Sequence, residues 1–208
     1  FKDEFNRTLM LRGVNLGGST KVPFTPNGAT FNSEGFYDTK NISFVGRPFP
    51  LAEADEHYAR LKAWGFNFIR FLITWEAIEH AGPGIYDKDY LDYLFEVVKK
   101  AGDYGLNLFI DPHQDVWSRF SGGDGAPGWL FDLLGMDITK FSETGAALLH
   151  QVEGKAYPRM QWITNDYKYV AATMNTRFFA GDDFAPKTMI EGQPAQHFMQ
   201  EHYFNAVK

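Results

Sequence analysis

The stretch FNFIRFLITWEAIEHAGPGIYDKDYLDYLFEVVKKAGDYGLNLFIDPHQD (residues 66–115) decides the fold, because it predicts a strand, a helix and a second strand in succession. Residues 66–75 are rich in Phe and Ile and apolar at odd and even positions alike, which is typical of a parallel strand covered on both faces. Residues 106–111 predict another buried strand, which Pro112 ends because proline has no amide hydrogen for the ladder. A right-handed crossover then brings the carboxyl ends of both strands to one edge of the sheet.

The helix predicted over residues 87–105 joins these two strands. Asp87 is a candidate N-cap, and Lys99 and Lys100 lie in the last turn, where positive charge suits the helix dipole. Four apolar residues at helical spacing predict the face that packs on the sheet, namely Leu91, Leu94, Phe95 and Val98.

Further elements are predicted on both sides of this stretch. A short strand is expected within residues 9–18, broken at Gly13, Gly17 and Gly18. A helix is expected from Pro50 to Gly65, with Leu51, Ala54, Tyr58 and Leu61 on its buried stripe. Two more helices are predicted at 169–181 and 193–208, and two long irregular insertions at 19–49 and 117–166.

Alternating strands and helices predict an α/β fold with a parallel sheet. A complete (β/α)8 barrel takes about 250 residues, whereas the 208 residues here supply three convincing strands. We therefore expect residues 1–208 to be the amino-terminal portion of a single barrel domain, comprising the first three or so β/α units of a TIM barrel.

Composition excludes several classes of protein. The formal net charge is −6 and no basic stripe is present, so nucleic acid is not an expected partner. No run approaches the roughly 20 apolar residues of a transmembrane helix, and the N-terminus lacks the apolar core of a signal peptide. The sequence has no cysteine, which favours a reducing compartment. We expect an intracellular protein, in the cytosol or the vacuole, without a transmembrane segment.

Arg70 lies inside the predicted strand 66–75, where an unpaired guanidinium is costly. It therefore needs a carboxylate or a polar pocket. Two interpretations are open at this point. One is a structural ion pair within the sheet, and the other is an arginine that holds a catalytic carboxylate ionised and oriented.

Asp111, His113 and Asp115 follow the second strand at alternate positions, so an extended backbone directs all three side chains the same way. They are interpretable as metal ligands, as a cluster that hydrogen-bonds a polyhydroxylated ligand, or as caps of the strand end. Pro112 and the lack of a further histidine pair at ligand spacing argue against a metal, and we expect neither a metal nor a cofactor. Indole rings can stack on the C–H face of a sugar, and those available are Trp75, Trp117 and Trp129.

The motifs of other enzyme classes are missing. GVNLGG and SGGDGAPG do not have the spacing of a phosphate-binding loop before a helix, and no GK[ST] is present. No Gly-x-Ser-x-Gly elbow occurs either.

Three stretches resemble the first three β/α units of glycoside hydrolase family 5: LRGVNLGG (11–18), GFNFIRFLITWEAIEHAGPGIYDKDYLDYL (65–94) and LNLFIDPHQDVWSRFSGGDGAPGW (106–129). More narrowly, they resemble the endoglycoceramidase-related branch, whose fungal members are β-glucosidases of glucosylceramide and steryl glucosides. RFFAGDDFAP (177–186) and EGQPAQHFMQEHY (191–203) extend the resemblance over nearly the whole chain.

The resemblance implies roles for individual residues. Arg70 corresponds to the arginine that supports the catalytic nucleophile, His113 to the histidine that lines the sugar subsite, and Asp115 to its sugar-contacting neighbour. Lys21 is a further candidate sugar contact, and Trp117 completes the predicted substrate-binding set. The implied partners are a glycolipid or other β-glucoside and the remainder of the barrel, in the same chain or a second one.

The implied reaction is retaining hydrolysis, which uses two carboxyl groups about 5–5.5 Å apart. In the family the acid/base follows an asparagine, and the dipeptide Asn-Glu is missing from these 208 residues. None of the candidates Glu76, Glu79, Glu143 and Glu191 matches either catalytic position. We expect both catalytic glutamates after Lys208, so that these residues alone are inactive.

Two other functions are open on the sequence. One is a non-catalytic carbohydrate- or lipid-binding module, and the other is a metal-dependent hydrolase that uses Asp111, His113 and Asp115. For the hydrolase of lipid-linked glucosides, we expect the insertions at 19–49 and 117–166 to shelter the lipid.

Overall fold

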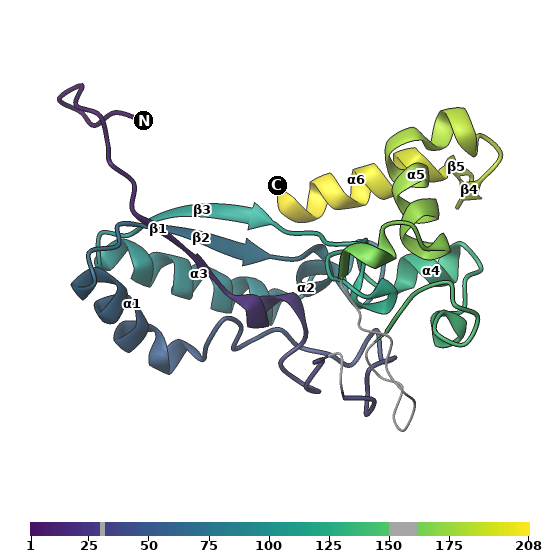
Figure 1. The fold of residues 1–208 in the computed structure, drawn as a ribbon, viewed down its shortest axis with the longest axis horizontal. Helices are drawn as coiled ribbons and strands as arrows, with labels where there is room; N and C mark the ends of the chain where they lie inside the picture. The colour runs from purple at the N-terminus through teal and green to yellow at the C-terminus, as the bar shows by residue number, and fades with distance from the viewer. Residues whose placement is uncertain (30–31, 150–161) are drawn as a thin grey trace.

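A three-stranded parallel sheet forms the centre of the chain in the computed structural model, which describes residues 1–29, 32–149 and 162–208. The strands are β1 (Gly13–Leu16), β2 (Phe68–Ile73) and β3 (Asn107–Pro112), in the order β1-β2-β3 (Figure 1). Arg70 is aligned with Asn15 on one side and with Phe109 on the other. The predicted α/β class and parallel sheet are confirmed.

Two helices cover one face of this sheet, α1 (Ala54–Ala63) and α3 (Lys88–Asp103), as Figure 1 shows below the strands. A 3-10 turn, Leu51–Glu53, leads into α1, and Gly65 follows it with a φ of 82°. Alternate residues of β2 point into this layer and are buried against it, namely Ile69, Phe71 and Ile73. The helices predicted from residue 50 and from residue 87 are both confirmed, including Asp87 as the N-cap that accepts from the Tyr90 amide.

The predicted buried stripe of α3 is confirmed in part, since Leu91 and Leu94 are half-buried and pack against the core. The buried residues are Tyr90, Tyr93, Val97 and Ala101, whereas Phe95 is 66% exposed. Tyrosine packs inside here because its hydroxyl finds a backbone acceptor, and the Tyr93 hydroxyl donates to Phe49 O at 2.5 Å. Aliphatic spacing alone therefore placed the stripe one position away from the face that the tyrosines occupy.

β3 is not the buried strand that its composition predicts. It lies at an edge of the sheet, and Phe109 and Ile110 are 54% and 40% exposed. Pro112 is its last residue, as expected. At the other edge Gly13 begins β1 rather than breaking it, and the turn comes at Gly17, whose φ is 108°.

The insertion predicted at 19–49 is irregular where it is described. It begins in a 3-10 turn, Gly18–Lys21, and contains an isolated bridge between Thr25 and Ser43. Residues 30–31 of this insertion and 150–161 of the second one lie outside the described residues.

A second group of helices gathers at the carboxyl ends of the strands, on the right in Figure 1. Its long helices α5 (Tyr169–Phe184) and α6 (Ala195–Val207) confirm the helices predicted at 169–181 and 193–208. They are joined through a small antiparallel pair, β4 (Met189–Ile190) and β5 (Gln193–Pro194). The short elements of this region are α2 (Trp75–Glu79), α4 (Trp129–Leu133) and the 3-10 turns Arg119–Ser121, Ile138–Lys140 and Trp162–Asn165.

Two buried glutamates of α2 hold this second group together. Glu76 forms an ion pair with the buried Arg119 at 2.8 Å. Glu79 accepts from Trp75 Nε1 at 2.5 Å and is 2.8 Å from His202 Nδ1 on α6. Both carboxylates therefore link elements of the fold to one another.

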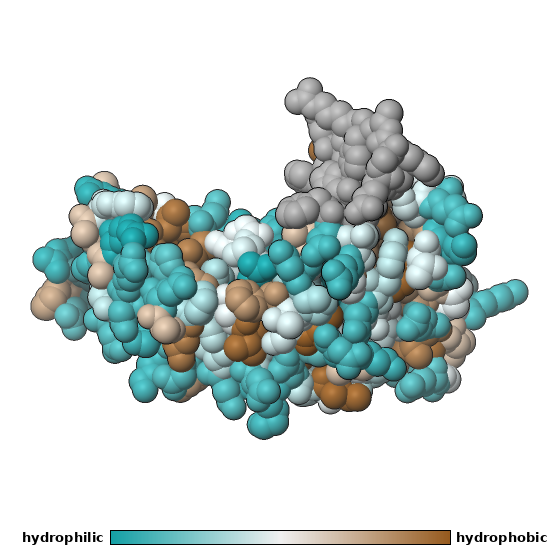
Figure 2. Space-filling view, turned by 90° about the horizontal axis from the view of Figure 1, so that it is seen from below, coloured by the Kyte–Doolittle hydropathy of each residue, from teal (hydrophilic) through white to brown (hydrophobic). Residues whose placement is uncertain are grey.

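The molecular surface seen from below is largely hydrophilic, with apolar side chains between the polar ones (Figure 2). Among the described residues, the helices include none with the length and apolar character required to cross a bilayer.

Candidate active site

Arg70 and Asp111 meet across neighbouring parallel strands. The distance from Arg70 Nη2 to Asp111 Oδ2 is 2.6 Å, and both side chains are partly exposed. The two side chains lie on the sheet face opposite α1 and α3, because β2 directs its odd-numbered residues into that helical layer. The predicted convergence of Arg70 with the residues that follow β3 is present.

His113 lies between two aspartates. Its Nδ1 is 2.9 Å from Asp111 Oδ2 and 3.1 Å from Arg70 Nη2, and its Nε2 is 3.0 Å from Asp115 Oδ2. The His113 amide donates to Ile73 O at 2.7 Å, so the backbone continues the strand direction beyond Pro112. This explains why the alternate residues Asp111, His113 and Asp115 share one side.

Lys21 reaches the same cluster from the turn that follows β1. Its Nζ is 2.5 Å from Asp115 Oδ2 and 3.4 Å from Asp124 Oδ2. Burial alone would lower the pKa of Lys21, but the hydrogen bond and charge of Asp115 and the charge of Asp124 raise it above its usual value. Burial likewise works against ionised Asp115, but its contacts with Lys21 and His113 bring the pKa of this aspartate below the usual range.

Asp124 belongs to this cluster, although it is not among the predicted site residues. It forms a backbone bridge with Asp115, and burial raises the pKa of Asp124 to about 7. A Cβ on Gly123 would lie 1.9 Å from Asp115 O, so this glycine permits the close backbone approach. The signal was an aspartate with glycines on both sides in SGGDGAPG, a motif tested only for phosphate binding.

A depression of about 680 Å³ opens beside these groups, and we call it the Arg70 depression. Four of the five predicted site residues line it, and Lys21 contacts it only through Asp115. Aromatic residues of α5 and α6 form much of the remaining lining, namely Phe178, Phe179, Tyr203 and Phe204. These four are not among the predicted site residues, although adjacent aromatic residues in a helix cannot all point into one core.

The indole rings do not all play the part predicted for them. Trp75 and Trp129 are buried, and their Nε1 atoms donate to the Glu79 side chain and to Glu79 O, so neither offers a face to a sugar. Trp117 lines the Arg70 depression but is only 1% exposed. It has a φ of 83°, an unusual conformation for a residue with a Cβ, and its Nε1 is buried without a partner in the described structure.

The side chains of His113, Asp115 and Asp124 are the group in the described residues with the spacing of metal ligands, their ligand atoms lying within 4.8 Å of one another. Asp111 is not in this group, although the metal hypothesis included it. Lys21 Nζ contacts both aspartates of the group and so already supplies a positive charge there.

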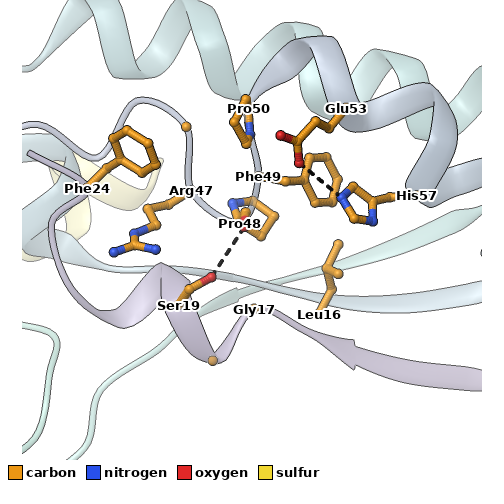
Figure 3. A pocket seen from close by; sticks show the side chains of 12 residues that line it. Leu16, Gly17, Ser19, Phe24, Arg47, Pro48, Phe49, Pro50, Glu53 and His57 are labelled. Carbon is orange, nitrogen blue, oxygen red and sulfur yellow. Dashed lines mark hydrogen bonds and ion pairs between the residues drawn. The ribbon is translucent and has the colours of Figure 1, made fainter. Parts of the chain in front are cut away.

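A second depression of about 430 Å³, the Arg47 depression, lies between the end of β1 and the start of α1 (Figure 3). Arg47 packs over the ring of Phe24 at 5.3 Å, and Glu53 faces His57 at 3.4 Å. None of the predicted site residues lines it. The Arg70 depression is therefore the candidate active site.

Comparison with known proteins agrees with the observed fold. The sequence profile of cellulase (glycosyl hydrolase family 5) matches residues 24–183. A glucosylceramidase of Rhizopus delemar is 50% identical over the whole chain, which covers 31% of that protein, and the ergosteryl-beta-glucosidase of Saccharomyces cerevisiae is 40% identical, with 30% covered. The chain thus spans about a third of the length of these relatives.

Solved structures of similar fold belong to enzymes with related names. Sterylglucosidase 1 of Cryptococcus neoformans matches the whole chain with a TM-score of 0.93 and 44% identity, and the match covers 30% of that chain. Endo-glycoceramidase II of Rhodococcus sp. matches 99% of the chain and 36% of its own, with a TM-score of 0.60 and 26% identity. The predicted fold class, the first units of a TIM barrel, is confirmed, and the sheet is not closed within the described residues.

Proposed function

Because the chain belongs to glycosyl hydrolase family 5, we propose that it supplies part of the sugar site of a retaining β-glucosidase that acts on lipid-linked glucosides. The whole of residues 1–208 then belongs to one catalytic barrel domain. The observation that carries the proposal is the joining of Arg70, Asp111, His113 and Asp115 into one network, beside aromatic side chains, in a single depression.

Retaining hydrolysis needs one carboxyl group as acid/base and another as nucleophile. We place both outside these 208 residues. Glu76 and Glu79 are buried and engaged with Arg119, Trp75 and His202, so they are not available to a substrate. Glu143 pairs with Lys140 on the surface and does not line the Arg70 depression.

Each predicted residue has a chemical task in this proposal. Asp111 and His113 orient the Arg70 guanidinium, which then stabilises the ionised nucleophile by its charge. His113 and Asp115 offer a donor and acceptors to sugar hydroxyls, and Lys21 holds Asp115 in place. Trp117 closes the depression on its apolar side.

The lipid part of the substrate fits the aromatic lining from α5 and α6. Phe179 and Phe204 are 71% and 58% exposed beside the charged network, so they offer apolar surface next to the sugar site. The relatives named glucosylceramidase, ergosteryl-beta-glucosidase and sterylglucosidase indicate ceramide and sterol as the aglycones to test. An intracellular location is part of the proposal, and the absence of cysteine from the sequence supports it.

The test is an assay of the full-length protein that contains these residues. Glucosylceramide, a steryl β-glucoside and a soluble fluorogenic β-glucoside are offered in parallel, and the configuration of the released sugar is followed by NMR. Release of glucose with retained configuration is expected. Inversion, or binding of the glycolipid without hydrolysis, would contradict the proposal, and the second result would favour the non-catalytic module.

A further inference from the structure

Asp124 is a buried acid that the proposed mechanism leaves without a task. It is 2% exposed, and its Oδ1 is buried without a hydrogen-bond partner in the part of the chain that the structure describes. Its other oxygen, Oδ2, is 3.4 Å from Lys21 Nζ. A buried carboxyl group with one unsatisfied oxygen is costly, so its position needs a reason.

The backbone fixes Asp124 in this position. The Asp124 amide donates to Asp115 O at 2.9 Å, and the Asp115 amide donates to Asp124 O at 3.2 Å. Gly123 and Gly125 stand on either side, and added Cβ atoms would lie 1.9 Å from Asp115 O and 2.7 Å from Gln114 Cγ, respectively. The backbone of Asp124 therefore cannot move away from Lys21 without disrupting the segment that carries Asp115.

Three ionisable groups face Asp124: Lys21 from the turn after β1, and His113 and Asp115 from the segment after β3. Burial is the largest influence and raises the pKa of Asp124 to about 7, while the charges of Lys21 and His113 oppose this and that of Asp115 adds to it. A pKa of about 7 places the change in charge of Asp124 near neutral pH, whereas the pKa of neighbouring Asp115 is lowered.

We propose that Asp124 is a positioning residue that acts through Lys21 on Asp115, holding Lys21 on Asp115 when it is neutral and drawing Lys21 away when it is ionised. The distances favour Asp115 as the partner, at 2.5 Å against 3.4 Å, as expected for neutral Asp124. Asp115 lines the Arg70 depression, so loss of the Lys21 contact loosens a group that binds the sugar. This inference rests on the proposed function.

The decisive experiment compares the full-length wild-type protein with Asp124→Asn, which keeps the shape of the side chain and removes its titration. Asp89 is exposed on α3, and Asp89→Asn is the matched control. KM and kcat for 4-methylumbelliferyl β-D-glucoside are measured from about pH 5.5 to about pH 8.5, a range that brackets the expected titration. KM of the wild type and of Asp89→Asn should rise about threefold across neutral pH, the size of one lost hydrogen bond, while Asp124→Asn keeps the lower value throughout.

Equal KM profiles for the wild type and Asp124→Asn would overturn the inference. A similar pH-dependent rise of KM in Lys21→Met would also overturn it, because this variant has no ammonium group for Asp124 to attract. A purely structural role of Asp124 would change thermal stability and leave the KM profile parallel to that of the wild type.

Two further measurements separate this inference from the proposed function. If the wild type hydrolyses no β-glucoside, the proposed function fails, and Asp124 is then tested by the ¹³C signal of its carboxyl group and by calorimetric titration with glucose. A signal that titrates near neutral pH, with weaker glucose binding above it, would sustain the role of Asp124. Titration in the ordinary range of aspartate, about pH 4, would refute it.

Discussion

Arg70 on β2 and Asp111 on β3 are bound to each other at 2.6 Å, and His113 contacts both of them. Each of the three side chains limits the rotation of the other two, so the guanidinium has a fixed direction on this face of the sheet. Such mutual orientation is what a site needs if charge is to be held in place before a reaction begins.

Replacing Arg70 with Ala should lower kcat/KM for a soluble β-glucoside by at least about a hundredfold, because a charged group near the reacting atoms is lost. Arg70→Lys should recover only part of this loss, since an ammonium cannot hold Asp111 and a second carboxylate in the fork geometry of a guanidinium. Steady-state kinetics of the full-length protein check this. Arg60→Ala removes an arginine from an exposed pair on α1 and is the control. Near-normal turnover in Arg70→Ala would remove Arg70 from the site.

The pair of Lys21 and Asp115 should behave as one unit in substrate binding. Lys21→Met and Asp115→Asn should each raise KM by at least about threefold, and the double variant should be little worse than the more impaired single variant, because each loss already breaks the same contact. A double-mutant cycle on KM measures the coupling directly. Strictly additive effects would show that the two side chains act independently.

The free energy of unfolding should fall as the pH rises from about 4 to about 7, because the pKa of Asp124 is raised in the folded state. The folded state keeps the Asp124 proton up to about pH 7, whereas an unfolded aspartate releases it near pH 3.9, so folding takes up a proton between these values. The cost to folding grows to at most about 4 kcal/mol and is constant above neutral pH.

Urea denaturation at a series of pH values measures this effect as the difference between the wild type and Asp124→Asn. The difference should increase in favour of the variant through this window and then level off. The lowered pKa of Asp115 acts in the opposite direction, and its contribution is lost only as the pH falls below the usual range of aspartate. A difference that is independent of pH would show that Asp124 does not titrate in this window.

Glu76→Gln should destabilise the protein by about 3 kcal/mol, because the buried Arg119 guanidinium loses its carboxylate partner. It should leave kcat unchanged, because Glu76 does not line the Arg70 depression. Thermal or urea unfolding measures the first effect, and kinetics of the folded fraction measures the second. Glu143→Gln, which breaks the exposed pair with Lys140, should change stability by less than about 1 kcal/mol. A large loss of kcat in well-folded Glu76→Gln would instead place this residue in the chemistry.

Phe179→Ala and Phe204→Ala should impair hydrolysis of lipid-linked glucosides and spare methyl β-glucoside. Each ring offers roughly 1.5–3 kcal/mol of apolar contact, so KM for the lipid substrate should rise about tenfold or more. Phe95→Ala removes an equally exposed ring from α3 and is the control. Equal losses on both substrates would show that the aromatic residues do not contact the aglycone.

The order of the elements was predictable because it follows from local patterns. The strand pattern of residues 66–75, the N-cap Asp87 and the stop at Pro112 all depend on neighbours in the chain, and each appears in the structure. Burial was harder to predict. The tyrosine face of α3 depends on backbone acceptors supplied by other elements, and the exposure of Phe109 depends on the position of β3 within the sheet.

The candidate site likewise contains residues that the sequence predicts and residues that it does not. Arg70, His113 and Asp115 were predictable because parallel strands bring their carboxyl ends together. Asp124 was not, since its importance comes from a bridge between two loops. The aromatic lining of α5 and α6 was only partly predictable: adjacent aromatic residues in a helix cannot all enter one core, but which of them reach the site depends on the tertiary packing of those helices.

The exposed apolar edge at Phe109 and Ile110 has a practical consequence for anyone who produces these 208 residues by themselves. Such an edge offers unpaired backbone groups beside exposed apolar side chains, and this combination favours pairing with a strand of another molecule and hence aggregation into inclusion bodies. Placing a lysine at either position would be the simplest remedy for a recombinant preparation.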